Sequence, residues 1–246
     1  MLLAVSLSVL VGAFAQRVTG MGFALVASPA LVLLLGPFDG VFVVNLCAVL
    51  SSLLILPRVW RAIDWPRLAR LLPAAIVGTA VGAVVAASVP GPALQFGIGV
   101  LVLVALTATL LASRTARVPD RLGVTLAAGG ASGFMNAAAG VGGPAIAVYA
   151  IATRWPQPAF AATNQPYFVA IGVASLVGKF AASGWSLPEL DPSMWIAVAV
   201  AVVLGLVVGE LLHRRIGNRA ARIGVIVLAY LGAAAATVDG AIELLA

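Results

Sequence analysis

Long apolar runs follow one another along almost the whole chain, separated by proline, glycine or charged residues. A helical run of about 20 residues is long enough to cross roughly 30 Å of hydrocarbon. Six such spans are expected, near residues 40–57, 68–88, 92–112, 159–182, 192–212 and 223–242. The pattern therefore predicts an all-α polytopic membrane protein.

Two further apolar stretches, residues 2–35 and 122–152, are too long for one crossing and are interrupted by glycine. The interruptions are Thr19-Gly20-Met21-Gly22 and Gly140-Val141-Gly142-Gly143-Pro144. Lipid cannot satisfy the backbone groups of a broken helix, so such a helix must be buried in protein or line a watery cavity. Broken helices at corresponding positions in two halves are typical of the substrate site of a transporter.

Arginine clusters distinguish between two ways of folding the broken stretches. The clusters comprise Arg58, Arg61, Arg67 and Arg70; Arg114, Arg117 and Arg121; and Arg214, Arg215, Arg219 and Arg222. If each broken stretch crossed once, the first and third clusters would lie on opposite sides, against the positive-inside rule. If each stretch folds back on itself, all three clusters and Arg154 become cytoplasmic. We therefore predict re-entrant hairpins, with two short full crossings as the alternative.

The hairpin topology implies an internal repeat. Each half then holds a hairpin and three single crossings, so the second half must be inverted relative to the first. Pro37 precedes Asn45 by eight residues, and Pro156 precedes Asn164 by the same number. The predicted organisation is a single membrane domain, residues 1–246, with repeat one at about 1–112, an inner loop at 113–121 and repeat two at about 122–246.

Composition leaves no room for a soluble domain. Apolar residues make up 63% of the chain and charged residues 9%, against roughly 25% charged residues in soluble domains. Cys47 is the only cysteine, so an internal disulfide is excluded and no thiolate cluster is available for a metal or other cofactor. Residues 1–15 lack a basic start, and the apolar pattern resumes soon after them, so we expect this segment in the mature protein.

An intramembrane enzyme is not supported by the sequence. Ser132 has no histidine to activate it inside the bundle, because the one histidine, His213, falls in a loop. No two facing acids are expected in the core either. The high isoelectric point, about 10.7, is explained by arginines that face anionic lipid rather than by nucleic-acid binding.

The helices that start after the two glycine breaks are candidate anion-binding elements. The first N–H groups of a helix have no intrahelical partner and carry partial positive charge. Glycine lets ligand oxygens approach the backbone closely. The candidate substrate-binding residues are Gln16, Arg17, Thr19, Gly20, Gly22, Asn45, Asn136, Gly140, Gly142, Gly143, Asn164 and Gln165.

Each polar candidate has an alternative structural interpretation. Buried amides also join helices in membrane bundles. Arg17 either attracts the anion or extends its side chain to the interface, since a charge near the bilayer centre is costly. Lys179, near the outer end of its helix, is expected to extend its ammonium group to the interface.

The arrangement of glycine break, apolar half-helix, proline and polar residue, given twice, resembles the sulfite exporter TauE/SafE family of membrane permeases. The segment from Gly140 to Tyr149, GVGGPAIAVY, is similar to the second glycine motif of that family. The first motif departs from the family pattern, because Gly20-Met21-Gly22-Phe23 has two glycines and Pro29 follows only later. The resemblance covers nearly the whole chain.

The resemblance implies outward movement of a small organosulfur anion, such as sulfite or a sulfonate, across the bacterial cytoplasmic membrane. The expected partners are this anion and membrane lipid, and a homodimer is compatible with the sequence. Export of an anion from a negative interior needs no coupling ion, which favours uniport over proton antiport. An anion channel and a non-transporting membrane assembly subunit are the alternative functions.

Overall fold

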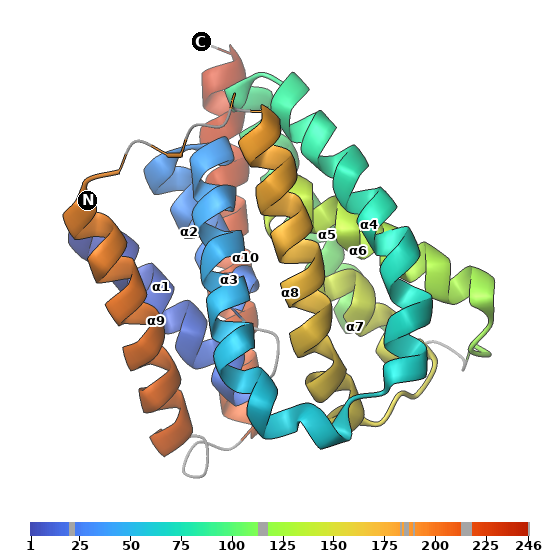
Figure 1. Ribbon diagram of the computed structural model, residues 1–246. Helices are drawn as coiled ribbons and strands as arrows, with labels where there is room; N and C mark the ends of the chain where they lie inside the picture. Colours follow the sequence, from blue (N-terminus) through green and yellow to red (C-terminus); the bar gives the residue numbers. More distant parts are fainter. Residues whose placement is uncertain are drawn as a thin grey trace.

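The computed structural model describes residues 1–19, 23–112, 118–182, 184, 187–188, 190–212 and 218–245; for Thr19 and residues 218–222 it describes the backbone only. Within these ranges the chain is helical and contains no strand (Figure 1). The helices are α1 (Leu2–Thr19), α2 (Phe23–Leu35), α3 (Pro37–Val59), η1 (Trp60–Ala62), α4 (Trp65–Ser88), α5 (Gly91–Ala112), α6 (Leu122–Ala139), α7 (Gly143–Ala152), α8 (Gln157–Ala182), α9 (Pro192–Leu212) and α10 (Asn218–Leu245).

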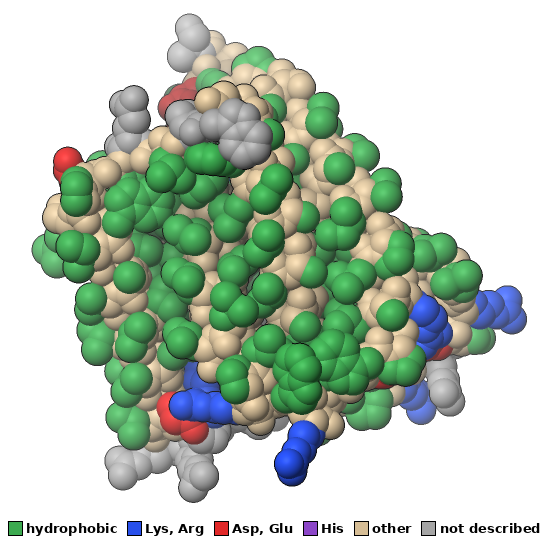
Figure 2. Space-filling view, in the orientation of Figure 1, with side chains coloured by type: hydrophobic (Ala, Val, Ile, Leu, Met, Phe, Trp, Pro, Cys, Tyr) green, Lys and Arg blue, Asp and Glu red, His purple; other side chains and the backbone are tan. Residues whose placement is uncertain are grey.

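The six predicted spans are confirmed. Among the described residues, six helices are long and apolar enough to cross a membrane: Pro37–Ala62, Trp65–Ser88, Gly91–Ala112, Gln157–Ala182, Pro192–Leu212 and Ile223–Leu245. Apolar side chains such as Val77, Val84 and Ile196 are more than half exposed. Figure 2 shows hydrophobic side chains spread over the whole length of the visible face. A protein with such a surface is stable in lipid rather than in water, so this is a polytopic membrane protein.

The second broken stretch folds back on itself. The backbone N–H of Val118, which precedes α6, donates to the carbonyl of Ala152, which ends α7, at 2.9 Å. The chain therefore leaves this stretch where it entered, and the prediction of a hairpin is confirmed here. Gly140 ends α6 in the left-handed region, with φ 72°, and its N–H donates to Asn136. A glycine makes this turn without the steric cost of a Cβ.

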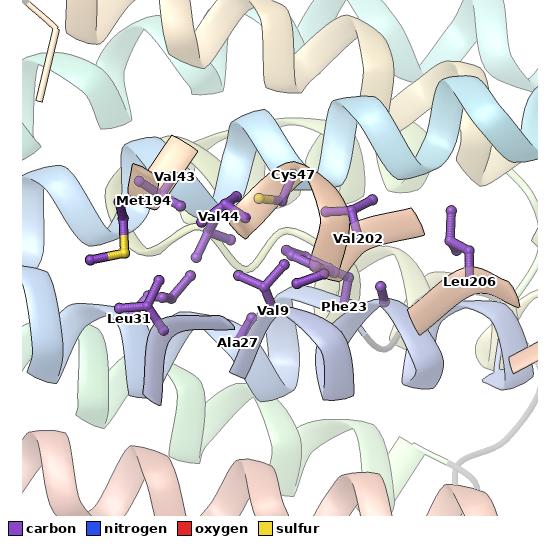
Figure 3. Close-up of a cluster of buried hydrophobic side chains, with 14 of the residues drawn as sticks. Val9, Phe23, Ala27, Leu31, Val43, Val44, Cys47, Met194, Val202 and Leu206 are labelled. Carbon is purple, nitrogen blue, oxygen red and sulfur yellow. The ribbon is translucent and has the colours of Figure 1, made fainter. Parts of the chain in front are cut away.

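The first broken stretch has a similar form. Phe23 and Ala27 of α2 pack against Gly12 of α1, and in Figure 1 α2 returns toward the end of the molecule at which α1 begins. Gly20, Met21 and Gly22, which would form the tip, lie outside the described residues. The side chains between α1, α2, α3 and α9 form one apolar cluster (Figure 3), which includes Val9, Phe23, Ala27, Leu31, Val44, Cys47 and Val202.

The helices of the two halves pack in corresponding pairs. In the predicted repeats, helices α1 to α5 correspond in order to α6 to α10. Helix α1 packs on α9, and the equivalent helix α6 packs on α4. Helix α2 contacts α10, and the equivalent helix α7 contacts α5. Two further pairs, α3 with α8 and α5 with α10, join equivalent helices directly. A two-fold relation between repeats would produce this pattern. The inverted repeat itself stays a prediction.

Glycines bring the equivalent helix pairs close together. A Cβ on Gly133 of α6 would overlap the carbonyl oxygen of Ala75 in α4, and one on Gly205 of α9 would overlap that of Leu10 in α1. Small residues allow this backbone approach, which supplies much of the packing energy between helices in lipid. The two crossings hold α6 and α1, the long arms of the broken stretches, in place.

Arginines gather toward one end of the molecule, along the lower edge and at the lower right in Figure 2. There the carboxylate of Asp120 pairs with Arg67 at 2.7 Å and Arg70 at 3.4 Å, both on α4. The hydroxyls of Tyr149 and Thr125 donate to Asp120 at 2.6 and 3.0 Å. This network ties α4, α6 and α7 together at the base of the second hairpin.

Asp120 should therefore stabilise the hairpin in its charged form. Burial alone would raise the pKa of Asp120, but hydrogen bonds from Tyr149, Arg67 and Thr125, together with the charge of Arg67, lower this pKa to about 2. An unfolded aspartate has a pKa of about 3.9. Because the folded pKa is the lower one, the stabilisation is complete above about pH 4 and is lost as the pH falls toward 2.

We expect Tyr149→Phe to lower the free energy of unfolding at pH 7 by about 1–2 kcal/mol, because it removes a hydrogen bond to a charged group. The difference from the wild type should shrink below pH 4. Denaturation of the purified protein in detergent at several pH values measures both effects. Tyr230→Phe is the matched control, since the Tyr230 hydroxyl pairs with neutral Thr107 at 2.8 Å and its removal should show no such pH dependence.

The hairpin topology also predicts which loops share a side of the membrane. Single cysteines introduced as Ala62→Cys, Val118→Cys and Gln157→Cys should react with an impermeant thiol reagent from one side, and Leu187→Cys from the other. The native Cys47 is fully buried, so it should give a low background. Labelling of Val118→Cys from the side of Leu187→Cys would contradict the topology.

Candidate functional site

The second helix break lies in the interior of the protein, where all residues from 135 to 144 are buried. A Cβ on Gly140 would lie 3.1 Å from Val44 of α3 and 3.3 Å from the Ser28 hydroxyl of α2. Ser28 donates to the carbonyl of Ala139, the last residue of α6. The protein thus satisfies backbone groups that lipid would leave unpaired, as a broken helix in a membrane requires.

Two asparagines join the halves beside this break. Asn136, in the last turn of α6, donates to the Asn45 side-chain oxygen of α3 at 2.7 Å. Asn45 donates to the backbone oxygens of Val41 at 3.0 Å and of Asn136 at 3.3 Å. Asn136 also donates to the carbonyl of Ile171 in α8 at 3.5 Å. The two side chains therefore lie where α3, α6 and α8 meet.

The N-terminus of α7 begins next to the asparagine pair. A Cβ on Gly142 would lie 3.0 Å from that of Asn136 and 2.8 Å from the carbonyl oxygen of Ser132. The Ser132 hydroxyl donates to the carbonyl of Gly142 at 2.8 Å. Gly143 and Pro144 then open the ten-residue helix α7. An electropositive helix end, glycine backbone that no Cβ covers and two amides suit a small oxyanion.

The other predicted residues lie in separate contacts. Gln16 donates to Ser52 at 3.2 Å and accepts from Ser51 at 2.8 Å, which joins α1 to α3. Arg17 pairs with Glu210, which Arg58 also contacts at 3.2 Å. Asn164 and Gln165 are buried on α8. Thr19 is described by its backbone alone, and Gly20 and Gly22 lie outside the described residues.

The structure thus brings together Asn45, Asn136, Gly140, Gly142 and Gly143, and it holds Gln16 and Arg17 in networks of their own. Sequence reasoning missed the hydroxyls of Ser28 and Ser132, which support the break. Their signal was weak, because a serine in an apolar helix commonly bonds within its own helix. Among the described residues, no group of three or more His, Cys, Asp or Glu side chains could hold a metal ion.

The expectation for Lys179 is wrong. Its side chain does not reach an interface but is fully buried, and the ammonium lies 4.3 Å from the ring centroid of Phe38. Phe38 of α3 lies beside it, and a Cβ on the neighbouring Gly178 would lie 3.0 Å from that of Ala83 in α4, so Lys179 is enclosed by protein.

Comparison with known families decides the identity of the chain. The family model for the sulfite exporter TauE/SafE matches residues 4–236. The chain belongs to this family. No curated protein and no solved structure matches the chain. The TauE/SafE family consists of membrane transporters of sulfite and organosulfur anions rather than enzymes, so the buried glycine break lies in a transporter.

We expect the TauE/SafE chain to depend on glycine at position 140 more than at other helix ends. Gly140→Ala should lower the free energy of unfolding by about 1–2 kcal/mol, because an alanine strains the left-handed conformation and would press on Val44. Thermal unfolding in detergent measures the change. Gly123→Ala, in the open first turn of α6, should leave stability unchanged or raise it slightly. Equal effects of the two variants would contradict a structural role of the turn.

Proposed function

We propose that the protein is a permease that exports a small oxyanion of sulfur, sulfite or an organosulfonate, and holds it near the bilayer midplane at the N-terminus of α7. The observation that carries this proposal is the buried break at residues 140–142, beside the hydrogen-bonded pair of Asn45 and Asn136. Helix N–H groups and amide N–H groups both donate hydrogen bonds, which are the contacts that oxyanion oxygens accept.

The lack of a positive side chain in this cluster supports transport rather than storage of the anion. Backbone and amide dipoles attract an anion, yet they bind it less tightly than a guanidinium pair would. A transport site must bind its substrate and then release it. Both N–H groups of each amide already donate within the protein, so a substrate oxygen would replace the longest of these bonds, from Asn136 to the carbonyl of Ile171 at 3.5 Å.

The first half would complete the site. Helix α2 begins at Phe23, directly after the first glycine break, and its N-terminus would face the substrate as that of α7 does. Thr19, Gly20 and Gly22 belong to this part of the proposal. Asn164 and Gln165 on α8 would contribute amides, since Asn164 occupies the position in its half that Asn45 occupies in the first.

The direction of transport follows from charge. With the arginine-rich end on the cytoplasmic side of a bacterial cell membrane, the interior is electrically negative. Moving one negative charge outward then releases about 2.3 kcal/mol per 100 mV. Export of the anion can proceed on this energy without a coupled proton, so we propose uniport.

Transport by purified protein in liposomes tests the proposal. Preloaded vesicles should exchange labelled sulfite or sulfoacetate in a saturable manner. Asn136→Ala should raise the half-saturation concentration about tenfold, because 1.4 kcal/mol corresponds to a factor of ten and is of the order of one hydrogen bond to a charged group. An anion channel would instead give a non-saturating conductance, and an assembly subunit would give no flux.

Gln95→Ala is the matched control for the asparagine variant. Gln95 is also a buried amide that joins two helices, since it donates to Asp239 at 2.6 Å, but it lies between α5 and α10 and outside the site. Its loss should lower stability without changing the half-saturation concentration. If Asn136→Ala behaves in the same way, the asparagine pair only joins helices and the proposed site is wrong.

A further inference from the structure

Lys179 is an unusual cation in this protein. It is the only lysine in the sequence, beside 13 arginines. It lies in the last turn of α8, and its side chain is fully buried. The asparagine pair and the arginine-rich network of Asp120 do not involve it. A buried ionisable side chain in a membrane protein is costly and commonly marks a substrate pathway.

The surroundings of the Lys179 ammonium compensate its charge only in part. Its nitrogen is buried and makes no hydrogen bond to the part of the chain that the structure describes. The face of the Phe38 ring, 4.3 Å away, attracts a cation. The charge of Asp39 in the first turn of α3 also acts on it, as does the C-terminal dipole of α8. None of the three donor positions of the ammonium is thus used by an acceptor among the residues that the structure describes.

A second buried polar atom without a partner lies one helical turn away. The hydroxyl of Ser175 is fully buried and has no hydrogen-bond partner among the described residues. Ser175 precedes Lys179 by four residues, so both lie on one face of α8. Four residues further back on that face, the carbonyl of Ile171 accepts a hydrogen bond from Asn136.

Ile171, Ser175 and Lys179 follow one face of α8 from the proposed site toward the end of the helix. Ile171 and Lys179 are separated by about 12 Å along the axis of α8, at 1.5 Å per residue. The opposing helix α3 runs beside them, with Asn45 near Gly172 and Phe38 at Lys179. This face leads along the packing of α3 on α8 to the end of α8, where the chain continues into residues 183–191.

We propose that Lys179 is a second anion-binding residue, which binds the anionic group of the substrate between the asparagine pair and the end of the molecule opposite the arginines. This inference rests on the proposed function and extends it to the far half of the path. The anion reaches the ammonium when α3 and α8 separate at Phe38, and Ser175 donates a further hydrogen bond to it. In the closed packing the ring of Phe38 takes the place of the anion.

The chemistry of lysine suits such a transient contact. An ammonium is a compact charge on a flexible stem, whereas a guanidinium binds an oxyanion through two parallel hydrogen bonds. A single anionic oxygen can therefore enter and leave without breaking a bidentate pair. Because α8 presents this charge from within the protein, neutral molecules of similar shape would gain little from it.

Lysine-selective labelling tests the proposal directly, since Lys179 is the only lysine. The purified wild-type protein is treated with an amine-reactive ester, and peptide mapping separates Lys179 from the N-terminal amine. Methanesulfonate is the test anion, because it does not consume the reagent, and dimethyl sulfone is its uncharged control. We expect slow labelling of Lys179 that methanesulfonate slows at least fivefold and dimethyl sulfone leaves unchanged.

Labelling that no anion slows would overturn the proposal, and so would complete absence of labelling, because the residue would then never become accessible. This assay needs no flux, so it separates failure of the inference from failure of the proposed transport. Protection without any flux would support anion binding at Lys179 while rejecting transport by this protein.

Variants give the second measurement. Lys179→Met keeps the length and apolar stem of the side chain, and replacing a buried charge in this way commonly preserves stability. We expect it to raise the half-saturation concentration for sulfoacetate at least tenfold in liposomes. Arg61→Met, which removes an exposed cation at the other end, should leave it unchanged. Unchanged half-saturation in a stable Lys179→Met protein would show that the ammonium only packs against Phe38.

Discussion

A helix that stops inside hydrocarbon leaves N–H and C=O groups that lipid cannot satisfy, and this constraint shapes the centre of the molecule. Around the break after α6, Ser28 donates to Ala139, and Ser132 donates to Gly142. The carbonyl of Asn136 accepts from both Gly140 and Asn45. These contacts come from α2, α3 and α6 itself. The break is therefore a junction that fixes several helices.

The helices that carry the junction are positioned by close backbone contacts. At Gly129 and Gly133 of α6 the backbone of α4 lies so close that a Cβ would overlap it. The same is true of Gly205 in α9 and the backbone of α1. In lipid such contacts replace the hydrophobic driving force that acts between helices in water. A charged side chain inside the bilayer is costly, and most of the charged groups lie at the helix ends. Asp120 and Glu210 each accept two arginines there, and this arrangement leaves the centre to neutral dipoles.

The sequence was informative where a property is local and less so where it depends on packing. The length of the apolar runs alone located the six spans. The rule that arginines lie on the cytoplasmic side predicted the second hairpin, which the hydrogen bond from Val118 to Ala152 confirms. Asn45 and Asn136 could be singled out as buried amides, but their direct bond depends on how α3 crosses α6. Arg17 pairs with Glu210, which is 193 residues away in sequence, and the ammonium of Lys179 packs against the ring of Phe38. Side-chain partners at such separations are set by the tertiary fold, and no local pattern reports them.

In the proposed mechanism, the distribution of positive charge would give the path a direction along which an anion is neither repelled nor trapped. At the arginine-rich end, Arg17 and Arg58 share the single carboxylate of Glu210, so that end keeps a net positive charge that draws anions from solution. The asparagines and glycines of the central junction offer dipoles alone, which on the proposed function would bind an oxyanion weakly enough to release it. The buried ammonium of Lys179 lies beyond the junction, and an aromatic ring compensates its charge in part. It would lower the energy of the anion on its way out, but it would bind the anion less tightly than the two parallel hydrogen bonds of a guanidinium. A stronger charge at the centre would bind the anion more tightly, but it would slow release at the step where an exporter must let its substrate go.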